Sequence, residues 1–93
     1  MVPAMTRIVL SGNVDPATAL SLRARLERET DVARPQVEVD LSRVVTLHAA
    51  AANALIRGQR RARRAAGTLR VIPPTAEAAA RTLHHIGLVE SGA

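Results

Sequence analysis

The 93-residue chain contains no Phe, Tyr, Trp or Cys. A core must therefore be built from Leu, Val, Ile and Ala, without the large area that an aromatic side chain buries. The same absence excludes disulfide bonds, zinc–thiolate sites, a cysteine nucleophile and aromatic stacking platforms for single-stranded nucleic acid. With 47% hydrophobic and 23% charged residues, the composition is typical of a globular protein, and the length predicts one domain over residues 1–93.

All 13 basic residues are Arg, and together with eight acidic residues they give a formal net charge of +5. This charge suits acidic partners of several kinds, namely nucleic acid, anionic lipid or an acidic protein surface, and selects none of them. The first ten residues lack the apolar run of a secretory signal, and the alanine-rich stretch 49–56 is too short to span a bilayer. We therefore expect a cytoplasmic protein without membrane insertion.

Apolar periodicity predicts strands that alternate with helices. Strands are expected over residues 5–11 (ending at a Gly12-Asn13 turn), 36–41 and 68–72, with a break at Ser42-Arg43 before an extended stretch, 44–47. Helices are expected from Asp15-Pro16 to about 30, over about 49–66 with Gly67 as the stop, and from a Thr75 cap to about 86. Leu88-Val89 could add one short strand. This alternation indicates a parallel or mixed sheet of βαβ units.

Three segments carry a resemblance to a known family. Residues 39–51 have the shape of a strand, an extended turn and a helix N-terminus, and they follow the Leu-Ser-Gly-Asn-Val-Asp run of residues 10–15. Residues 60–70 then read as a helix-to-strand passage. In this order the segments resemble the STAS family, found in bacterial anti-anti-sigma factors and sulfate-transporter tails. The resemblance covers about residues 6–89 and implies a small α/β domain, with a mixed sheet of about four strands flanked by three main helices.

The family motif that opens the second helix is altered in this chain. In anti-anti-sigma factors it reads Asp-Ser-Ser/Thr-Gly, and its second hydroxyl is phosphorylated by the anti-sigma kinase. Here the motif aligns on residues 48–51, His-Ala-Ala-Ala, which places Ala50 at the phosphoacceptor position. Neither Ala50 nor Ala49 has a hydroxyl, so the resemblance implies a protein that cannot be phosphorylated at the usual position.

The resemblance nevertheless implies a surface for docking a protein partner. Its candidate residues are Asn13, Asp15, His48, Ala49, Ala50, Ala51 and Asn53. The implied partner is an ATP-binding anti-sigma factor or a related regulatory protein. The alternative is a STAS-type scaffold or adaptor subunit of a stress-signalling or transport-ATPase complex. An imidazole at His48 would also make docking depend on pH between about 5 and 8.

A second alternative uses the arginines of the predicted helix 49–66. These are Arg57, Arg60, Arg61, Arg63 and Arg64. They favour the polar face of an amphipathic helix, with cations near the C-terminal end where the helix dipole stabilises them. Nucleic-acid binding through this face would be driven by phosphate contacts and sensitive to salt. Because the chain has no base-stacking residue, nucleic acid is the weaker hypothesis.

Residues that could support catalysis or metal binding are sparse. Ser11, Ser21, Ser42 and Ser91 are the only serines, and none stands in a nucleophile pattern. The adjacent His84 and His85 point about 100° apart on a helix, and we expect His84 on the surface and His85 partly buried. We therefore expect no enzyme, no metal site and no cofactor.

The family usually begins with an additional N-terminal strand, for which this chain offers only Met1–Ala4. A shortened edge would leave backbone groups of the first strand unpaired. Pairing with a second copy of the chain, as a homodimer, is therefore a further hypothesis.

Overall fold

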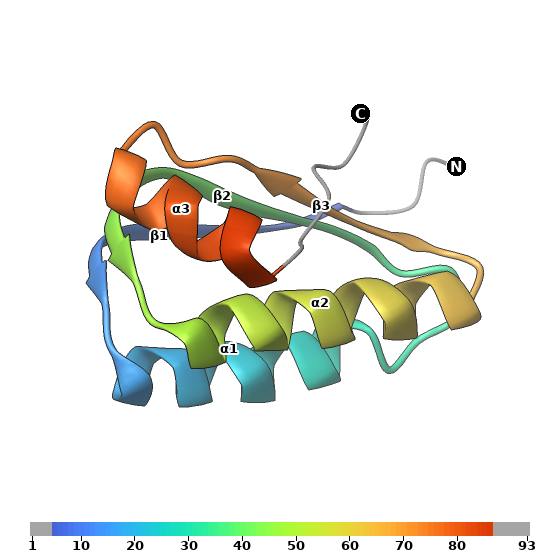
Figure 1. The fold of residues 1–93 in the computed structure, drawn as a ribbon. Helices are drawn as coiled ribbons and strands as arrows, with labels where there is room; N and C mark the ends of the chain where they lie inside the picture. Colours follow the sequence, from blue (N-terminus) through green and yellow to red (C-terminus); the bar gives the residue numbers. More distant parts are fainter. Residues whose placement is uncertain (1–4, 87–93) are drawn as a thin grey trace.

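The computed structural model describes residues 5–86, which form three strands and three helices in alternation (Figure 1). Their order is β1 (Thr6–Val14), α1 (Pro16–Glu29), β2 (Gln36–Leu47), α2 (Ala49–Arg64), β3 (Thr68–Ile72) and α3 (Glu77–Ile86). The predicted α/β class and the three helices are thereby confirmed.

The described part of the sheet has one strand fewer than the expected four or so, and it takes the parallel form of the two arrangements expected, parallel or mixed. Within residues 5–86 it has three strands in the order β1-β2-β3, and both pairings are parallel rather than mixed. The strands are parallel because α1 and α2 each return the chain to the edge from which the preceding strand started. Residues 1–4 and Leu88-Val89, the candidates for additional strands, lie outside the described residues.

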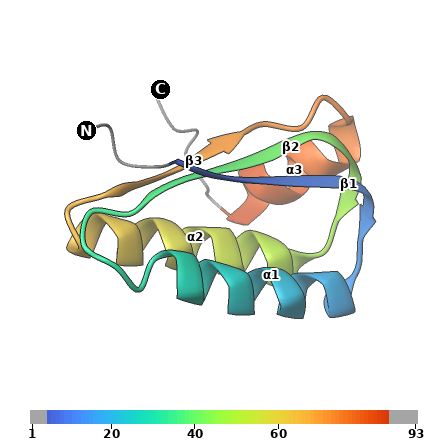
Figure 2. The ribbon, with the colours of Figure 1, turned by 180° about the vertical axis from the view of Figure 1, so that it is seen from behind.

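The three helices lie on one side of the sheet, so the molecule has two layers (Figures 1 and 2). Helix α2 contacts α1, α3 and β3. The core between the layers is purely aliphatic, as the composition requires. Its most deeply buried large side chains are Val39, Leu41, Val44 and Leu55.

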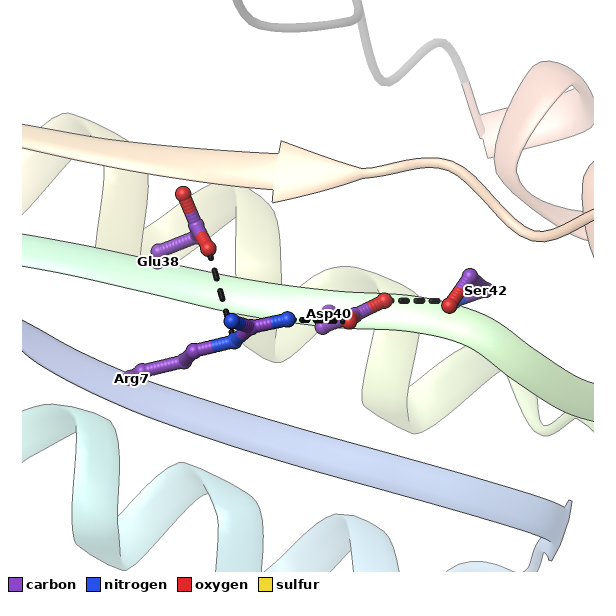
Figure 3. Close-up of polar contacts among 4 residues, drawn as sticks. All are labelled: Arg7, Glu38, Asp40 and Ser42. Atoms are coloured by element: carbon purple, nitrogen blue, oxygen red, sulfur yellow. Dashed lines mark hydrogen bonds and ion pairs between the residues drawn. The ribbon is translucent and has the colours of Figure 1, made fainter.

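The other side of the sheet carries alternate, mostly polar residues of the strands. There Arg7 of β1 lies across β2 and donates from its Nη2 to Asp40 Oδ2 at 2.8 Å, while its Nε lies 3.6 Å from Glu38 Oε1 (Figure 3). Asp40 Oδ1 accepts from the Ser42 N–H at 2.9 Å. On this face Arg7 therefore pairs with two carboxylates of β2.

Two predicted strand ends are wrong, and both are irregularities inside continuous strands. Gly12 has a φ of +69°, yet β1 continues through it to Val14. Opposite this part of β1, β2 runs on through Ser42-Arg43, and the register shifts between Val9 and Ser11 and again between Gly12 and Asn13. The extra residues of β2 are accommodated as bulges, because the neighbouring parallel strand continues to hold the backbone.

Helix α1 has its predicted boundaries, whereas the end of α2 and the start of α3 differ from the prediction. Helix α2 ends at Arg64, and Ala66, not Gly67, takes the left-handed conformation, with a φ of +61°. Helix α3 begins at Glu77, and the Thr75 hydroxyl donates to the Ser42 carbonyl at 3.3 Å. The expected partial burial of His85 is also wrong, since this side chain is exposed. The buried stripe of α3 includes Leu83, and two positions further along a helix lie on the opposite side.

Candidate docking surface at the N-terminus of α2

The predicted site residues meet because β1 and β2 are adjacent parallel strands that end at the same edge of the sheet. Val14, the last residue of β1, is paired with Leu47, the last residue of β2. The next residue, His48, donates its backbone N–H to the Val14 carbonyl at 2.9 Å. Both strands lead directly into helices, so the N-termini of α1 and α2 open side by side (Figure 1).

Asp15 is committed to the start of α1. Its side chain is the N-cap, and Oδ1 accepts from the Thr18 N–H at 2.8 Å. This backbone hydrogen bond is the main cause that lowers the pKa of Asp15 below its ordinary value. One residue before Val14, Asn13 Oδ1 accepts from the Thr46 hydroxyl at 2.7 Å. Both exposed polar groups therefore have fixed orientations.

His48 is the N-cap of α2. Its exposed side chain turns back on the helix, and Nδ1 accepts from the Ala50 N–H at 3.0 Å. In this geometry Nδ1 is the acceptor of the cap, and Nε2 is the ring nitrogen left for contact with solvent or a partner. His48 thus performs the capping that Ser, Thr, Asp or Asn usually provides.

The first turn of α2 is exposed on one side only. Ala49 and Ala50 are exposed, as is Asn53 about one turn further along. Ala51 is fully buried in the core, which excludes its side chain from direct contact with a partner and corrects its place among the candidate residues. The exposed remainder is here called the α2 N-terminal surface: Asn13, Asp15, His48, Ala49, Ala50 and Asn53.

This surface holds little reactive chemistry. Its carboxylate caps a helix, its imidazole Nδ1 is occupied, and the two alanines have no functional group. Within residues 5–86 no three His, Cys, Asp or Glu side chains are grouped so that they could hold a metal ion. None of the helices in the same range combines the length and the apolarity needed to cross a bilayer.

A groove that the sequence did not indicate adjoins this surface. It runs between α1 and α2, from Pro16 and Ala50 at one end to Thr30 and Arg61 at the other, and is here called the α1–α2 groove. Leu20 of α1 lies on its rim and is 67% exposed. A signal was available, because Leu20 is a large apolar residue outside the buried stripe of Ala19, Leu22 and Leu26.

Comparison with known proteins agrees with this architecture. Residues 1–90 match the family described as "Mlab, STAS domain". No curated protein matches the chain. The family match spans nearly the whole length, and the described fold alternates strands and helices as the resemblance implied. The chain therefore belongs to the STAS domain family.

Proposed function

We propose that this protein is a non-enzymatic protein-interaction module that docks onto its partner through the α2 N-terminal surface. The single observation that carries the proposal is the state of Ala50. It is exposed at the helix start, has no hydroxyl, and its N–H is already bound by the side chain of His48.

The arrangement supports docking that phosphorylation at this position cannot switch off. A phosphate on the first turn of a helix is normally stabilised by free N–H groups and by the helix dipole. Here the Ala50 N–H is used by His48, and no side chain of the first turn can carry the phosphate. The surface therefore presents one constant shape to a partner.

Two kinds of partner fit such a constant surface. The first is an ATP-binding anti-sigma factor or a related regulatory protein, bound by an antagonist that has lost its off-switch. The second is a larger assembly, for signalling or transport, in which the STAS domain is an adaptor subunit. An adaptor subunit needs no switch by phosphorylation, so the absence of the acceptor hydroxyl favours the adaptor role.

The test uses Ala50→Glu, which places a negative charge on the proposed surface. The immobilised protein captures partners from a lysate of its source organism, and mass spectrometry identifies them. We expect the specific partner to be captured at least about tenfold less by the variant, since an unpaired charge buried in an interface costs several kcal/mol. Ala80→Glu makes the same change on the exposed surface of α3 and is the matched control. Equal capture by Ala50→Glu and wild type would refute docking at this surface.

A second arm separates the two kinds of partner. The captured protein is purified and incubated with ATP and either wild type or Ala50→Ser. Uptake of one phosphate by Ala50→Ser, and none by wild type, indicates an anti-sigma kinase that still recognises the surface. A partner that binds both proteins and phosphorylates neither indicates an adaptor role.

A further inference from the structure

The α1–α2 groove is a continuous surface feature. Two hollows of about 260 Å³ and about 50 Å³ share Arg23, Ala54 and Arg57 as lining residues. Helices α1 and α2 approach closely at Gly58, since a Cβ placed on this residue would lie 3.4 Å from Leu26 Cδ1 of α1. The result is a shallow trough with an apolar floor.

The rims of the groove are positively charged. Arg23, Arg57 and Arg61 line it together with a single acid, Glu27. Arg23 Nε lies 3.2 Å from Glu27 Oε1, so these two charges offset each other. Arg57 and Arg61 form no ion pair with any residue of the described part of the chain. The α2 rim therefore presents two unpaired cations.

Helix stability explains only part of this charge. Arg61, Arg63 and Arg64 lie in the last turn of α2, where cations stabilise the helix dipole. Arg57 lies near the middle of the helix, beyond the reach of that effect, which fades within one turn. Arg57 is also four residues before Arg61, and like charges at this spacing destabilise a helix. A partner that neutralises both would remove this repulsion.

We propose that the α1–α2 groove binds an acidic amphipathic helix of a protein partner. The apolar side chains of that helix would cover Leu20 and the small residues of the floor, and its carboxylates would pair with Arg57 and Arg61. The groove follows α2 for about twelve residues, which at 1.5 Å per residue is about 18 Å and accommodates three to four turns of a docked helix. The inference rests on the proposed function in one respect, that the partner is a protein.

The groove also suits a protein better than a nucleic acid. Its floor offers Ala19, Ala54 and Gly58, which donate no side-chain hydrogen bond to phosphate. Exposed Leu20 gains from contact with apolar side chains and gains nothing from a phosphate backbone. Ala50 and Asn53 belong to both the groove and the α2 N-terminal surface, so one partner can cover the two together.

The test selects binders from a phage-displayed library of 15-residue peptides against the full chain. Selected peptides are then synthesised with a fluorescent label and titrated by anisotropy. We expect Asp and Glu beside apolar residues spaced three and four apart. We also expect affinity to fall at least about tenfold for Arg57→Glu/Arg61→Glu, because the substitutions replace two attractive charge contacts with two repulsive ones. Leu20→Asn, which leaves the charges unchanged, should weaken binding about threefold or more.

The matched control is Arg60→Glu/Arg64→Glu, which makes the same charge change on the same helix away from the groove lining. Equal losses in the two double variants, or selection of peptides without acidic residues, would overturn the proposal. So would a 20-base-pair DNA duplex that binds more tightly than the peptides, weakens steeply with salt and responds alike to both double variants. Groove variants that bind peptide normally while Ala50→Glu loses its partner would leave the proposed function standing and the groove proposal refuted.

Discussion

Asp40 is a carboxylate held by hydrogen bonds and an ion pair that lower its pKa strongly. It is only 8% exposed although it lies on the helix-free side of the sheet. The hydroxyl and the backbone N–H of Ser42, followed by the guanidinium of Arg7, lower the pKa of Asp40 from 3.8 to about 2. The Ser42 N–H that donates to Asp40 lies at the bulge of β2, where the sequence predicted a break in the strand. The ionisation of Asp40 and the shape of β2 are therefore linked.

Asp40→Asn is predicted to alter how stability depends on pH. Because the folded pKa is lowered, ionised Asp40 stabilises the fold at pH values above 3.8, and this contribution disappears as the pH falls toward 2. The variant should be less stable than wild type at pH 7, and the difference should shrink between pH 4 and pH 2. Urea unfolding followed by far-UV circular dichroism measures this, since the chain has no aromatic residue for fluorescence. A difference that is constant over this range would contradict it.

A suitable comparison is Glu27→Gln. It also removes one carboxylate from an ion pair with Arg, but both partners of that pair are about half exposed. Exposed pairs of this kind contribute about 0.3–0.5 kcal/mol. The asparagine of Asp40→Asn keeps an oxygen that can accept from the Ser42 N–H, so the comparison isolates the effect of the charge.

At the scale of the element, the end of α2 is a Schellman motif built on an unfavourable residue. The Gly67 N–H donates to the Ala62 carbonyl at 2.8 Å, and the Ala66 N–H donates to the Arg63 carbonyl at 3.1 Å. This pattern places Ala66 at the left-handed position that Gly usually occupies. An alanine in this conformation costs about 1–2 kcal/mol.

Ala66→Gly is therefore predicted to stabilise the protein. The glycine removes the left-handed strain and loses about 0.4–1 kcal/mol through the greater freedom of the unfolded chain. The net gain should be about 0.5–1 kcal/mol, seen as a rise of a few degrees in Tm by far-UV circular dichroism. Ala65→Gly, at a φ of −90°, lacks the strain and should destabilise. The prediction fails if both variants lower Tm.

Element type was predictable from the sequence where one pattern dominated. The apolar stripe of α1 and its Asp15-Pro16 start gave that helix, and alternation gave β3. The errors fall at residues that have local turn preferences. Gly12 and Ser42 are typical of turns, but pairing between β1 and β2 keeps both inside strands. Gly67 looks like the left-handed residue that ends a helix, but glycine is needed there because Pro35 lies against it. Local sequence does not show this neighbour.

At the scale of the whole molecule, two connections far apart in sequence are locked together. The Arg34 N–H donates to the Ala65 carbonyl at 2.8 Å, and the Thr68 N–H donates to the Pro35 carbonyl at 2.8 Å. A Cβ on Gly67 would overlap the backbone of Pro35. These contacts join the α1–β2 connection to the α2–β3 turn, and so fix the two parallel crossovers relative to each other.

The candidate docking surface and the groove also depend on this relative placement. Order along the chain was enough to predict that Asp15 and His48 each precede a helix, and parallel pairing then brings them together. The burial of Ala51 was predictable, because helical spacing places Ala51 on the same face as Leu55, opposite Asn53 and Arg57. The groove needs α1 and α2 side by side, which no local pattern encodes.

The contacts between the two connections predict that substitutions at Gly67 and Gly12 differ in their effect on the free energy of unfolding. Gly67→Ala forces backbone to separate from backbone, which side-chain movement cannot relieve, and should destabilise by about 3 kcal/mol. Gly12→Ala meets nothing within 4 Å, so it carries only the strain of a φ of +69° and should cost no more than about 1 kcal/mol. Urea midpoints by far-UV circular dichroism give both values. Equal costs would mean that the two connections are not held together as tightly as their hydrogen bonds indicate. The larger cost at Gly67 would instead mean that the close approach of Gly67 to Pro35 holds the α1–β2 connection against the α2–β3 turn.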